Sequence, residues 1–223
     1  MNILITGATG NLGHAVVDRF QTDNLIAITS VGKSSSLPKG VKGYEADLTQ
    51  EAAVDEAISQ ILKAHITIDA AVLLVGGFTF GGIDQANGEE VKKMFDMNFH
   101  TAYFVARPIF QYMAKQKNGR IVLVGARPAL DAHAGKNTVA YALSKSLIFT
   151  LAELLNAEGA DKNVVTSVVV PSIIDTPVNR DAMPKADFSK WVKPEEIADT
   201  IATLISEKSK SLREPIVKIY GSV

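Results

Sequence analysis

The stretch TGATGNLGHA, residues 6 to 15, decides the fold that this chain is expected to take. Gly7, Gly10 and Gly13 fall three residues apart in it, after the apolar run NILIT (2–6) and before a helical pattern. Glycines placed in this way permit a tight turn and let the backbone approach a pyrophosphate, which the N-terminus of the helix then attracts. A glycine turn that binds no ligand is the alternative, but the order of strand, turn, helix and second strand favours a dinucleotide site. The contacts expected there are Gly7, Thr9, Gly10, Asn11, Leu12 and Gly13.

Short apolar runs alternate with amphipathic segments along the rest of the chain. Several runs are apolar at consecutive positions, as is typical of strands that are covered on both faces. The remaining expected strands are 25–29, 41–45, 69–75, 120–124, 163–170 and 215–220. Pro194, followed by two acidic residues, marks the start of the last helix. We therefore predict an α/β fold: a single doubly wound (Rossmann) domain over residues 1–223, with a seven-stranded, mostly parallel sheet and helices on both faces.

The composition excludes several classes of function. The 223 residues are 47% hydrophobic and 21% charged, which is enough to bury the core of one large domain. A formal net charge of −1 means that the chain lacks the excess of positive charge that binding to nucleic acid or an anionic membrane requires. The absence of cysteine excludes disulfides, thiolate catalysis and cysteine metal sites, and the four histidines lack metal-ligand spacing.

The N-terminus and the hydropathy point to a cytoplasmic location. The first strand-like run begins at Asn2, which leaves no room for a signal peptide. The longest strongly apolar stretch, residues 70 to 78, is too short to span a bilayer. We expect a soluble, cytoplasmic protein that acts on a small molecule, with no metal, nucleic-acid or membrane partner.

The end of the second strand bears on which dinucleotide binds. An acidic residue there would hold a ribose 2′-hydroxyl and repel a 2′-phosphate, but ITSVGKSSS (28–36) contains none. Ser30, Lys33 and Ser34 can instead bind a phosphate, which favours NADP over NAD; an ordinary polar loop is the alternative. After the third strand, Asp47, next to Leu48, can accept a hydrogen bond from the adenine amino group, or cap the next helix.

Further motifs follow in an order that resembles the short-chain dehydrogenase/reductase family. After the glycine turn and Asp47 come VGG (75–77), Asn98, YALSK (141–145) and PSIIDT (171–176). The resemblance covers nearly the whole chain and implies the strand order 3-2-1-4-5-6-7. It also implies a homodimer or homotetramer built on two long helices, at 91–116 and 141–157. Independently of the resemblance, Pro108 within the first of these predicts a kink.

The resemblance implies roles for individual residues. Tyr141 would be the proton donor, Lys145 would anchor the ribose, and Asn98 would support a proton-relay water. The cofactor-binding set would further include Val75, Gly76, Gly77, Pro171 and Thr176. A surface pair on a helix is the alternative for Tyr141 and Lys145, since residues at i,i+4 share a face. In the functional interpretation, the lysine and an oxidised nicotinamide lower the pKa of the tyrosine from ~10 toward the working range.

One residue that the family usually carries is missing. The stretch VGARPAL (124–130) places Ala126 where a serine would hydrogen-bond the substrate carbonyl. Either the chain is an inactive member or its substrate needs no such bond. GARPALD and the block 175–191 are similar to dihydropteridine reductases, a branch of the family, which implies NAD(P)H-dependent reduction of a quinonoid dihydropterin under a substrate loop at about 175–193. Reducing such a ring restores its aromatic character, which lessens the need for a serine.

Two features depart from that branch, and other functions stay open. Dihydropteridine reductases usually carry an acid after the second strand and lack the asparagine found here at Asn98. A carbonyl or imine reductase acting on another small molecule is one alternative. A regulator that senses NAD(P) without turnover is another, although the retained Tyr141 and Lys145 oppose it. The aromatic residues of GGFTFGG (76–82) are expected to wall the pocket. His133 is expected to have a surface or packing role, with a contact to substrate as the alternative. Trp191 either closes a lid or anchors the last helix.

Overall fold

Across residues 1–222, which the computed structural model describes, seven strands form one sheet in the order β3-β2-β1-β4-β5-β6-β7. Every pairing between neighbouring strands is parallel. The predicted strand order is therefore confirmed, and the sheet is parallel throughout. The strands are β1 (Asn2–Thr6), β2 (Asn24–Thr29), β3 (Lys42–Glu45), β4 (Ala70–Leu73), β5 (Gly119–Val124), β6 (Val164–Pro171) and β7 (Ile216–Ile219).

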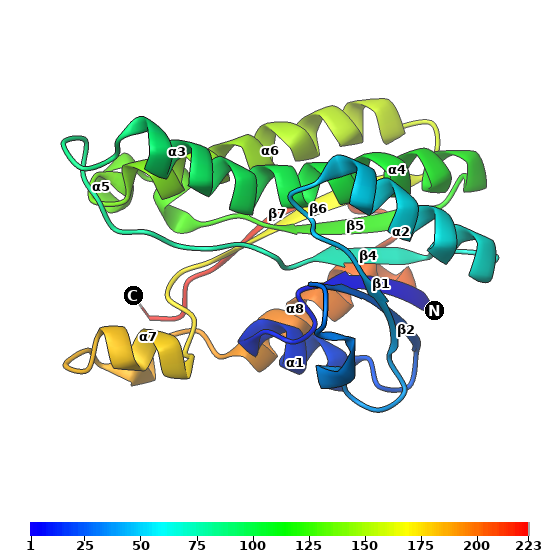
Figure 1. Ribbon diagram of the computed structural model, residues 1–223, viewed down its shortest axis with the longest axis horizontal. Coiled ribbons are helices and arrows are strands. Elements are labelled where there is room, and N and C mark those ends of the chain that lie inside the picture. Colours follow the sequence, from blue (N-terminus) through cyan, green and yellow to red (C-terminus); the bar gives the residue numbers. More distant parts are fainter. Residues whose placement is uncertain (223) are drawn as a thin grey trace.

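Helices cover both faces of the sheet, as predicted. One face carries α2 (Glu51–Ala64), α4 (Thr101–Gln116) and α6 (Val139–Gly159), and the other carries α1 (Asn11–Arg19) and α8 (Pro194–Ile205) (Figure 1). The last of these starts at the expected proline. Shorter helices are α3 (Gly88–Phe95), α5 (Ala132–Gly135) and α7 (Pro177–Ala182). No helix within residues 1–222 is long and apolar enough to cross a membrane.

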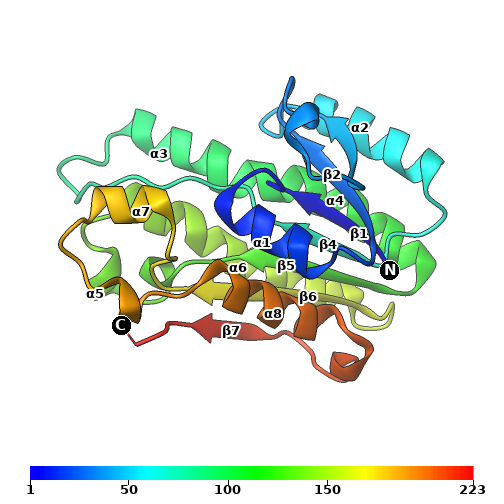
Figure 2. The same cartoon turned by 90° about the horizontal axis from the view of Figure 1, so that it is seen from below.

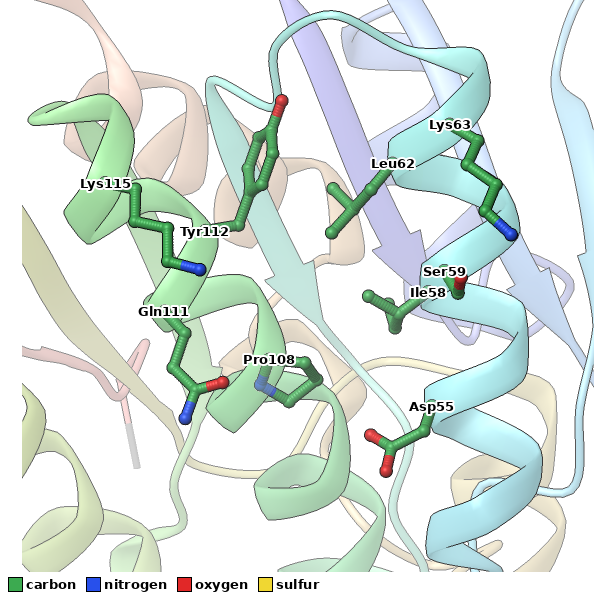
Figure 3. A pocket seen from close by; sticks show the side chains of 9 residues that line it. All are labelled: Asp55, Ile58, Ser59, Leu62, Lys63, Pro108, Gln111, Tyr112 and Lys115. Atoms are coloured by element: carbon green, nitrogen blue, oxygen red, sulfur yellow. The ribbon is translucent and has the colours of Figure 1, made fainter.

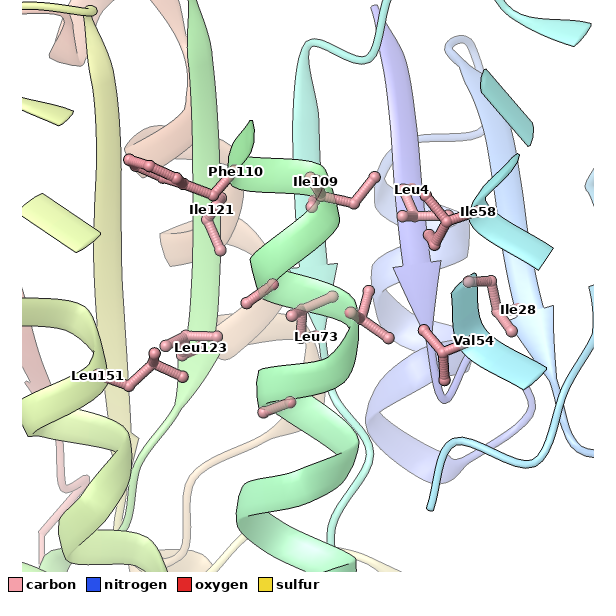
Figure 4. Close-up of a cluster of buried hydrophobic side chains, with 14 of the residues drawn as sticks. Leu4, Ile28, Val54, Ile58, Leu73, Ile109, Phe110, Ile121, Leu123 and Leu151 are labelled. Carbon is pink, nitrogen blue, oxygen red and sulfur yellow. The ribbon is translucent and has the colours of Figure 1, made fainter. Parts of the chain in front are cut away.

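The core consists of two hydrophobic layers separated by the sheet. Successive side chains of a strand point to opposite faces, so Leu4 of β1 packs toward α2 and α4 while Ile3 and Ile5 pack toward α1 and α8. Figure 4 shows the first layer, in which side chains of α2 and α4 meet those of the central strands. Each fully buried aliphatic side chain contributes roughly 1.5–3 kcal/mol. These layers hold the central strands rigid, and with them the loops at their ends.

The long helix expected at 91–116 is interrupted. The structure has α3, then a π-helical turn at Asp96–His100, then α4. Pro108 lies inside α4, and the change in winding occurs earlier in the chain, where Thr101 Oγ1 donates to Met97 O at 2.7 Å. The π turn was missed because the apolar pattern of the two helices runs through it. Asn98 lies within this turn and is buried between the loop after β4 and α6, with only 1% of its surface exposed.

The carboxyl ends of the strands meet at one edge of the sheet. In Figure 2 the arrowhead of β7 points toward the end of the molecule where α5 and α7 lie. The loops after β1, β2, β4, β5 and β6 all leave from this edge because the strands are parallel. In open α/β sheets ligands bind at this edge, where the strand order reverses, which here is between β1 and β4. The predicted site residues lie in these loops and in the helices that follow them.

Candidate active site

The glycine turn after β1 is shaped for close approach of a ligand. Gly7 has a φ of +75°, a conformation that favours glycine. A Cβ atom added at Gly13 would lie 2.0 Å from the Gly7 carbonyl oxygen, so only glycine lets α1 start directly above the turn. Gly10 is the N-cap of α1, and no side chain caps the helix. The first N–H groups of α1 thus remain available, which fits a pyrophosphate.

Asp47 closes a local turn after β3. Its Oδ1 accepts hydrogen bonds from the Thr49 N–H at 2.9 Å and the Thr49 hydroxyl at 2.7 Å. These bonds lower the pKa of Asp47 below its usual value. The N-cap of α2 is Gln50, so the alternative that Asp47 caps this helix is not realised. The carboxylate is exposed at the carboxyl edge while Leu48 is buried beside it, and the role of both in holding adenosine stays a prediction.

The loop after β2 is partly occupied by a residue that sequence reasoning passed over. Ser30 and Lys33 are exposed, as expected of phosphate-binding residues. Ser34 is already engaged, because its hydroxyl and its N–H both donate to the carboxylate of Glu45 at the end of β3. Glu45 lies outside ITSVGKSSS (28–36), the stretch in which an acid was expected. The parallel pairing of Thr29 with Glu45 brings it back to the loop.

Glycines after β4 let this loop lie against the π turn and α6. A Cβ at Gly76 would lie 2.7 Å from Asn98 Oδ1 and 3.2 Å from Lys145 Nζ, and one at Gly77 would lie 1.8 Å from Met97 Sδ. The Gly77 N–H donates to Asn98 Oδ1 at 2.9 Å. The structure thus brings the VGG motif, Asn98 and Lys145 together, as the prediction requires.

Asn98 also binds α6, through a serine that sequence reasoning missed. Its Nδ2 donates to Ser144 Oγ at 3.0 Å, and this hydroxyl donates to the Tyr141 carbonyl at 2.8 Å. Both Asn98 and Ser144 are buried. The side-chain amide of Asn98 therefore links the loop after β4 to the first turn of α6. A serine inside a long apolar helix was the signal that could have indicated this link.

Burial sets the protonation of Tyr141 and Lys145. The surrounding protein raises the pKa of Tyr141 to about 12, although the residue as a whole is only half-buried. Burial lowers the pKa of Lys145 to about 8, and its Nζ donates to the Val124 carbonyl at 2.8 Å. The expectation that the lysine lowers the pKa of the tyrosine is not met in the protein alone. The reason is that desolvation, which disfavours both charged forms, dominates.

Two phenylalanines line the approach to Tyr141. The ring of Phe78 lies 4.9 Å from that of Tyr141 and 4.7 Å from that of Phe80, edge to face in both cases. The loop that carries them is pinned beside α6, since Gly81 forms backbone hydrogen bonds with Asn137 and Val139, both at 2.8 Å. Phe78 and Phe80 remain 52% and 67% exposed, so their faces are open to a ligand.

Ala126 follows β5 at the same edge of the sheet. Its side chain is buried, with 3% of its surface exposed, and it begins a short 3-10 turn, η3 (Arg127–Ala129). The Ala129 N–H donates to its carbonyl at 3.1 Å. The turn packs against α6, which carries Tyr141. The residue therefore presents a methyl group where the family resemblance led us to look for a hydroxyl.

Comparison with known proteins agrees with this geometry. The family model for short chain dehydrogenase matches residues 1–187. This chain belongs to that family. It is 26% identical to the 3-oxoacyl-[acyl-carrier-protein] reductase MabA of Mycobacterium tuberculosis, over all of this chain and 92% of that protein. It is 29% identical to the dihydropteridine reductase of Dictyostelium discoideum, over 90% of this chain and 85% of that protein.

Solved structures show the same fold. The structure of ElxO with NADP bound superposes with a TM-score of 0.88 at 23% identity, covering 99% of this chain and 97% of that one. A 3-ketoacyl-(acyl-carrier-protein) reductase from Brucella melitensis complexed with NADH gives a TM-score of 0.85 at 20% identity, covering 100% of this chain and 98% of that one. The prediction of an oxidoreductase of this family, working with NADP or NAD, is thereby confirmed at the family level.

In this short chain dehydrogenase, the segment after β6 forms an irregular loop whose two ends are paired. Asp175 N donates to the Val192 carbonyl at 2.8 Å, and Val192 N donates to the Ile173 carbonyl at 3.0 Å. Thr176 is the N-cap of α7 and accepts from the Asn179 N–H at 3.3 Å. Pro171 ends β6, so both predicted nicotinamide contacts lie at the carboxyl edge.

Within the loop, aromatic and charged side chains form a chain of contacts. Arg180 binds both oxygens of Asp175, at 2.6 and 2.7 Å, and lies over the Phe188 ring, 4.9 Å from its centroid. The Phe188 ring in turn lies 4.8 Å from that of Trp191. Trp191 is 5% exposed, which favours the anchoring interpretation over a mobile lid.

Other features of the dehydrogenase lie apart from this site. A surface cavity of about 470 Å³ lies between α2 and α4 and contains none of the predicted site residues (Figure 3). Within residues 1–222 no three histidine or acidic side chains converge on a possible metal position. His133 is exposed in α5, as a surface role requires, and the alternative of a contact with substrate stays untested.

Proposed function

We propose that this dehydrogenase reduces a quinonoid dihydropterin-like substrate, with NADPH or NADH as the hydride source and Tyr141 as the proton donor. The observation that carries the proposal is the buried methyl group of Ala126 at the end of β5. A ketone reductase needs a hydrogen-bond donor to polarise the carbonyl, and a methyl group offers none. A quinonoid ring is already activated, because reduction restores its aromatic character. The likeness to a dihydropteridine reductase supports the same substrate class.

The aromatic pair beside Tyr141 suits a flat ring system. Phe78 and Phe80 are exposed beside Tyr141, and their rings can stack on a planar heterocycle. A fatty acyl chain would gain less from such stacking. These two residues therefore favour a cyclic conjugated substrate over a linear one.

The side chains of the site hold and move one proton. With a pKa of about 12, the Tyr141 phenol is protonated at neutral pH and is ready to donate. Lys145, with a pKa of about 8, is mostly an ammonium at that pH. It lies one helical turn from Tyr141 on the same face of α6, so its charge stabilises the phenolate left after donation. Asn98 keeps the β4 loop and α6 in register, and its segment supports the relay water that reprotonates the pair.

The residues that would hold the cofactor fit its parts. The turn that would bind the pyrophosphate consists of Gly7, Thr9, Gly10, Asn11, Leu12 and Gly13. Adenosine would be held by Asp47 and Leu48. The nicotinamide end would be held by Val75, Gly76, Gly77, Pro171 and Thr176. When bound, the reduced nicotinamide supplies the hydride. The structural support for this assignment is the tight packing of the glycine turn, in which a Cβ at Gly13 would lie 2.0 Å from the Gly7 carbonyl oxygen, and the start of α1, which no side chain caps.

A 3-oxoacyl or other carbonyl reductase is the second candidate. The likeness to MabA, which extends over the whole chain, favours it. In that case Ala126 marks a weakened enzyme that has lost a useful hydrogen bond. A sensor without turnover is disfavoured, since it needs neither Tyr141 nor Lys145.

One substitution separates the two reductases. Ala126→Ser should leave reduction of quinonoid dihydropterin within several-fold of the parent enzyme. A weakened carbonyl reductase should instead recover ketone reduction about ten- to a hundredfold, because one hydrogen bond to a charged transition state contributes ~1.5–3 kcal/mol. Steady-state rates on both substrates, with NADPH and with NADH, give the answer. Recovery with ketones and no pterin activity in either form would overturn the proposal.

A further inference from the structure

The carboxylate of Glu45 binds the loop that follows β2. Its Oε2 accepts from the Gly32 N–H at 3.0 Å, and its Oε1 accepts from the Ser34 N–H at 3.1 Å and the Ser34 hydroxyl at 2.5 Å. Glu45 and both partners are exposed. Three donors from one loop thus converge on a single anion that belongs to the neighbouring strand.

These donors lie where the two cofactors differ. In dinucleotide-binding sheets, the end of the second strand faces the ribose of adenosine, which carries a 2′-hydroxyl in NAD and a 2′-phosphate in NADP. Here β2 pairs with β1, which leads into the glycine turn, and with β3, which ends at Glu45. A phosphate at this position would seek N–H and hydroxyl donors of the kind that Glu45 already holds.

We propose that Glu45 is a specificity-determining residue for the cofactor: its carboxylate holds the donors of Gly32 and Ser34, so that NADPH must displace it and NADH need not. This inference rests on the proposed function, since it concerns the same cofactor site. The hydrogen bonds from the loop lower the pKa of Glu45, so the carboxylate remains charged at neutral pH. A 2′-phosphate beside it would therefore meet both a charge of the same sign and donors already engaged.

Lys33 acts in the opposite direction. It is exposed in the same loop, and within residues 1–222 it forms no ion pair, so its ammonium can reach a 2′-phosphate. The ratio of the affinities for NADPH and NADH is then set by the balance of two residues, Glu45 and Lys33. Removing either charge should move that ratio, and in opposite directions.

The experiment measures dissociation constants of NADPH and NADH for the parent enzyme and three variants. Glu45→Gln should tighten NADPH binding about tenfold and change NADH binding less than about twofold, because the amide keeps its shape but loses its charge. Lys33→Gln should weaken NADPH selectively. Glu153→Gln removes the same charge at an exposed position in α6. It is the matched control and should leave the ratio of the NADPH and NADH affinities unchanged. The fragments 2′,5′-ADP and ADP should reproduce the differences, since they carry only the adenosine end.

Different failures have different signatures. If Glu45→Gln changed the dissociation constants of NADPH and NADH by the same factor, Glu45 would only stabilise the loop, and the inference would be overturned. An unchanged dissociation constant for NADPH would also overturn it. If Glu45→Gln does not fold, Glu45→Asp replaces it, and its shorter carboxylate should give a smaller shift in the same direction; no shift there would also overturn the inference. If the parent enzyme binds neither cofactor, the proposed function itself fails, independently of Glu45.

Discussion

At the scale of single residues, burial pushes the proton affinities of Tyr141 and Lys145 away from their usual values in opposite directions. The pKa of the phenol rises to about 12 and that of the ammonium falls to about 8. Both changes favour the neutral form of the side chain, so the Tyr141 phenol keeps its proton until a substrate accepts it. The proposed reduction would benefit from this arrangement, because a tyrosine that donates a proton must be protonated before the step.

Replacing the tyrosine tests the donor role directly. Tyr141→Phe keeps the ring and its contact with Phe78 but removes the hydroxyl. Turnover should fall by roughly two to four orders of magnitude, the usual contribution of a positioned acid. The dissociation constant of the cofactor, measured by fluorescence titration, should change little. A mutant that keeps the parent turnover would remove Tyr141 from the mechanism.

The lowered pKa of Lys145 predicts a pH dependence of stability. Between the folded value of about 8 and the ordinary value of 10.5, the unfolded chain binds more protons than the folded one. Stability contributed by this group therefore rises with pH in that window. Relative to Lys145→Met, the parent should gain about 2 kcal/mol in free energy of unfolding between about pH 7 and pH 10.

Urea unfolding at a series of pH values measures this gain. The raised pKa of Tyr141 acts above its ordinary value of 10.0, in the opposite direction, so the comparison stops there. Lys136→Met, an exposed lysine in the same region, is the control and should show no such trend. A constant difference between the parent and Lys145→Met would mean that the lysine is not held at a lowered pKa.

At the scale of elements, the π turn between α3 and α4 is the feature that assembles the site. It turns Asn98 inward, where the amide binds the β4 loop on one side and Ser144 of α6 on the other. Three elements far apart in sequence are thereby joined by one side chain. Such turns often occur at functional sites because they redirect a single residue without ending a helix.

Two serines of α6 allow the hydrogen bond between Asn98 and Ser144 to be tested apart from the general effect of replacing a serine in this helix. Ser144 and Ser146 each donate to the carbonyl three residues earlier, at 2.8 and 2.7 Å, but only Ser144 accepts from Asn98. Ser144→Ala should cost about 1–3 kcal/mol of unfolding free energy, because the buried Asn98 amide loses its hydroxyl partner and keeps only the weaker contact with Met94 Sδ at 3.8 Å. Ser146→Ala should cost no more than ~0.5 kcal/mol. Thermal or urea unfolding of both variants decides, and equal costs would mean that the link contributes nothing.

At the scale of the whole molecule, the outer surface of α6 remains partly apolar. Leu143 and Leu154 are 48% and 65% exposed, and beside α6 the half-buried rings of Phe99, in the π turn, and Tyr103, in α4, are stacked. Exposed apolar surface on two neighbouring helices is typical of an interface. It supports the expectation of a homodimer or homotetramer, which stays a prediction.

Sedimentation equilibrium tests this prediction. The chain of 23.9 kDa should sediment as a dimer or tetramer, and Leu154→Glu should shift the equilibrium toward smaller species, because a charge would be buried at the contact. Glu153→Gln, at the neighbouring exposed position, should change the equilibrium much less. A parent protein that sediments at the monomer mass would contradict the prediction.

The sequence by itself determined the α/β fold, all seven strands, the strand order through family resemblance, and the glycine turn. These follow from local periodicity and from backbone conformations that only glycine permits, both of which are readable along the chain. Tyr141 and Lys145 were also identified from the sequence as candidate site residues, because they form the short motif YALSK. The start of α8 was predicted from Pro194 and the two acidic residues that follow it.

Only the tertiary structure decided how these parts meet. The link from Asn98 to Ser144, the engagement of Ser34 by Glu45, and the edge-to-face contact of Phe78 with Tyr141 each join residues from different elements. The pKa values of Tyr141 and Lys145 likewise depend on how much protein surrounds them. Periodicity reports which face of an element is buried, but not which side chain of another element lies opposite it, and desolvation is a property of the packed surroundings.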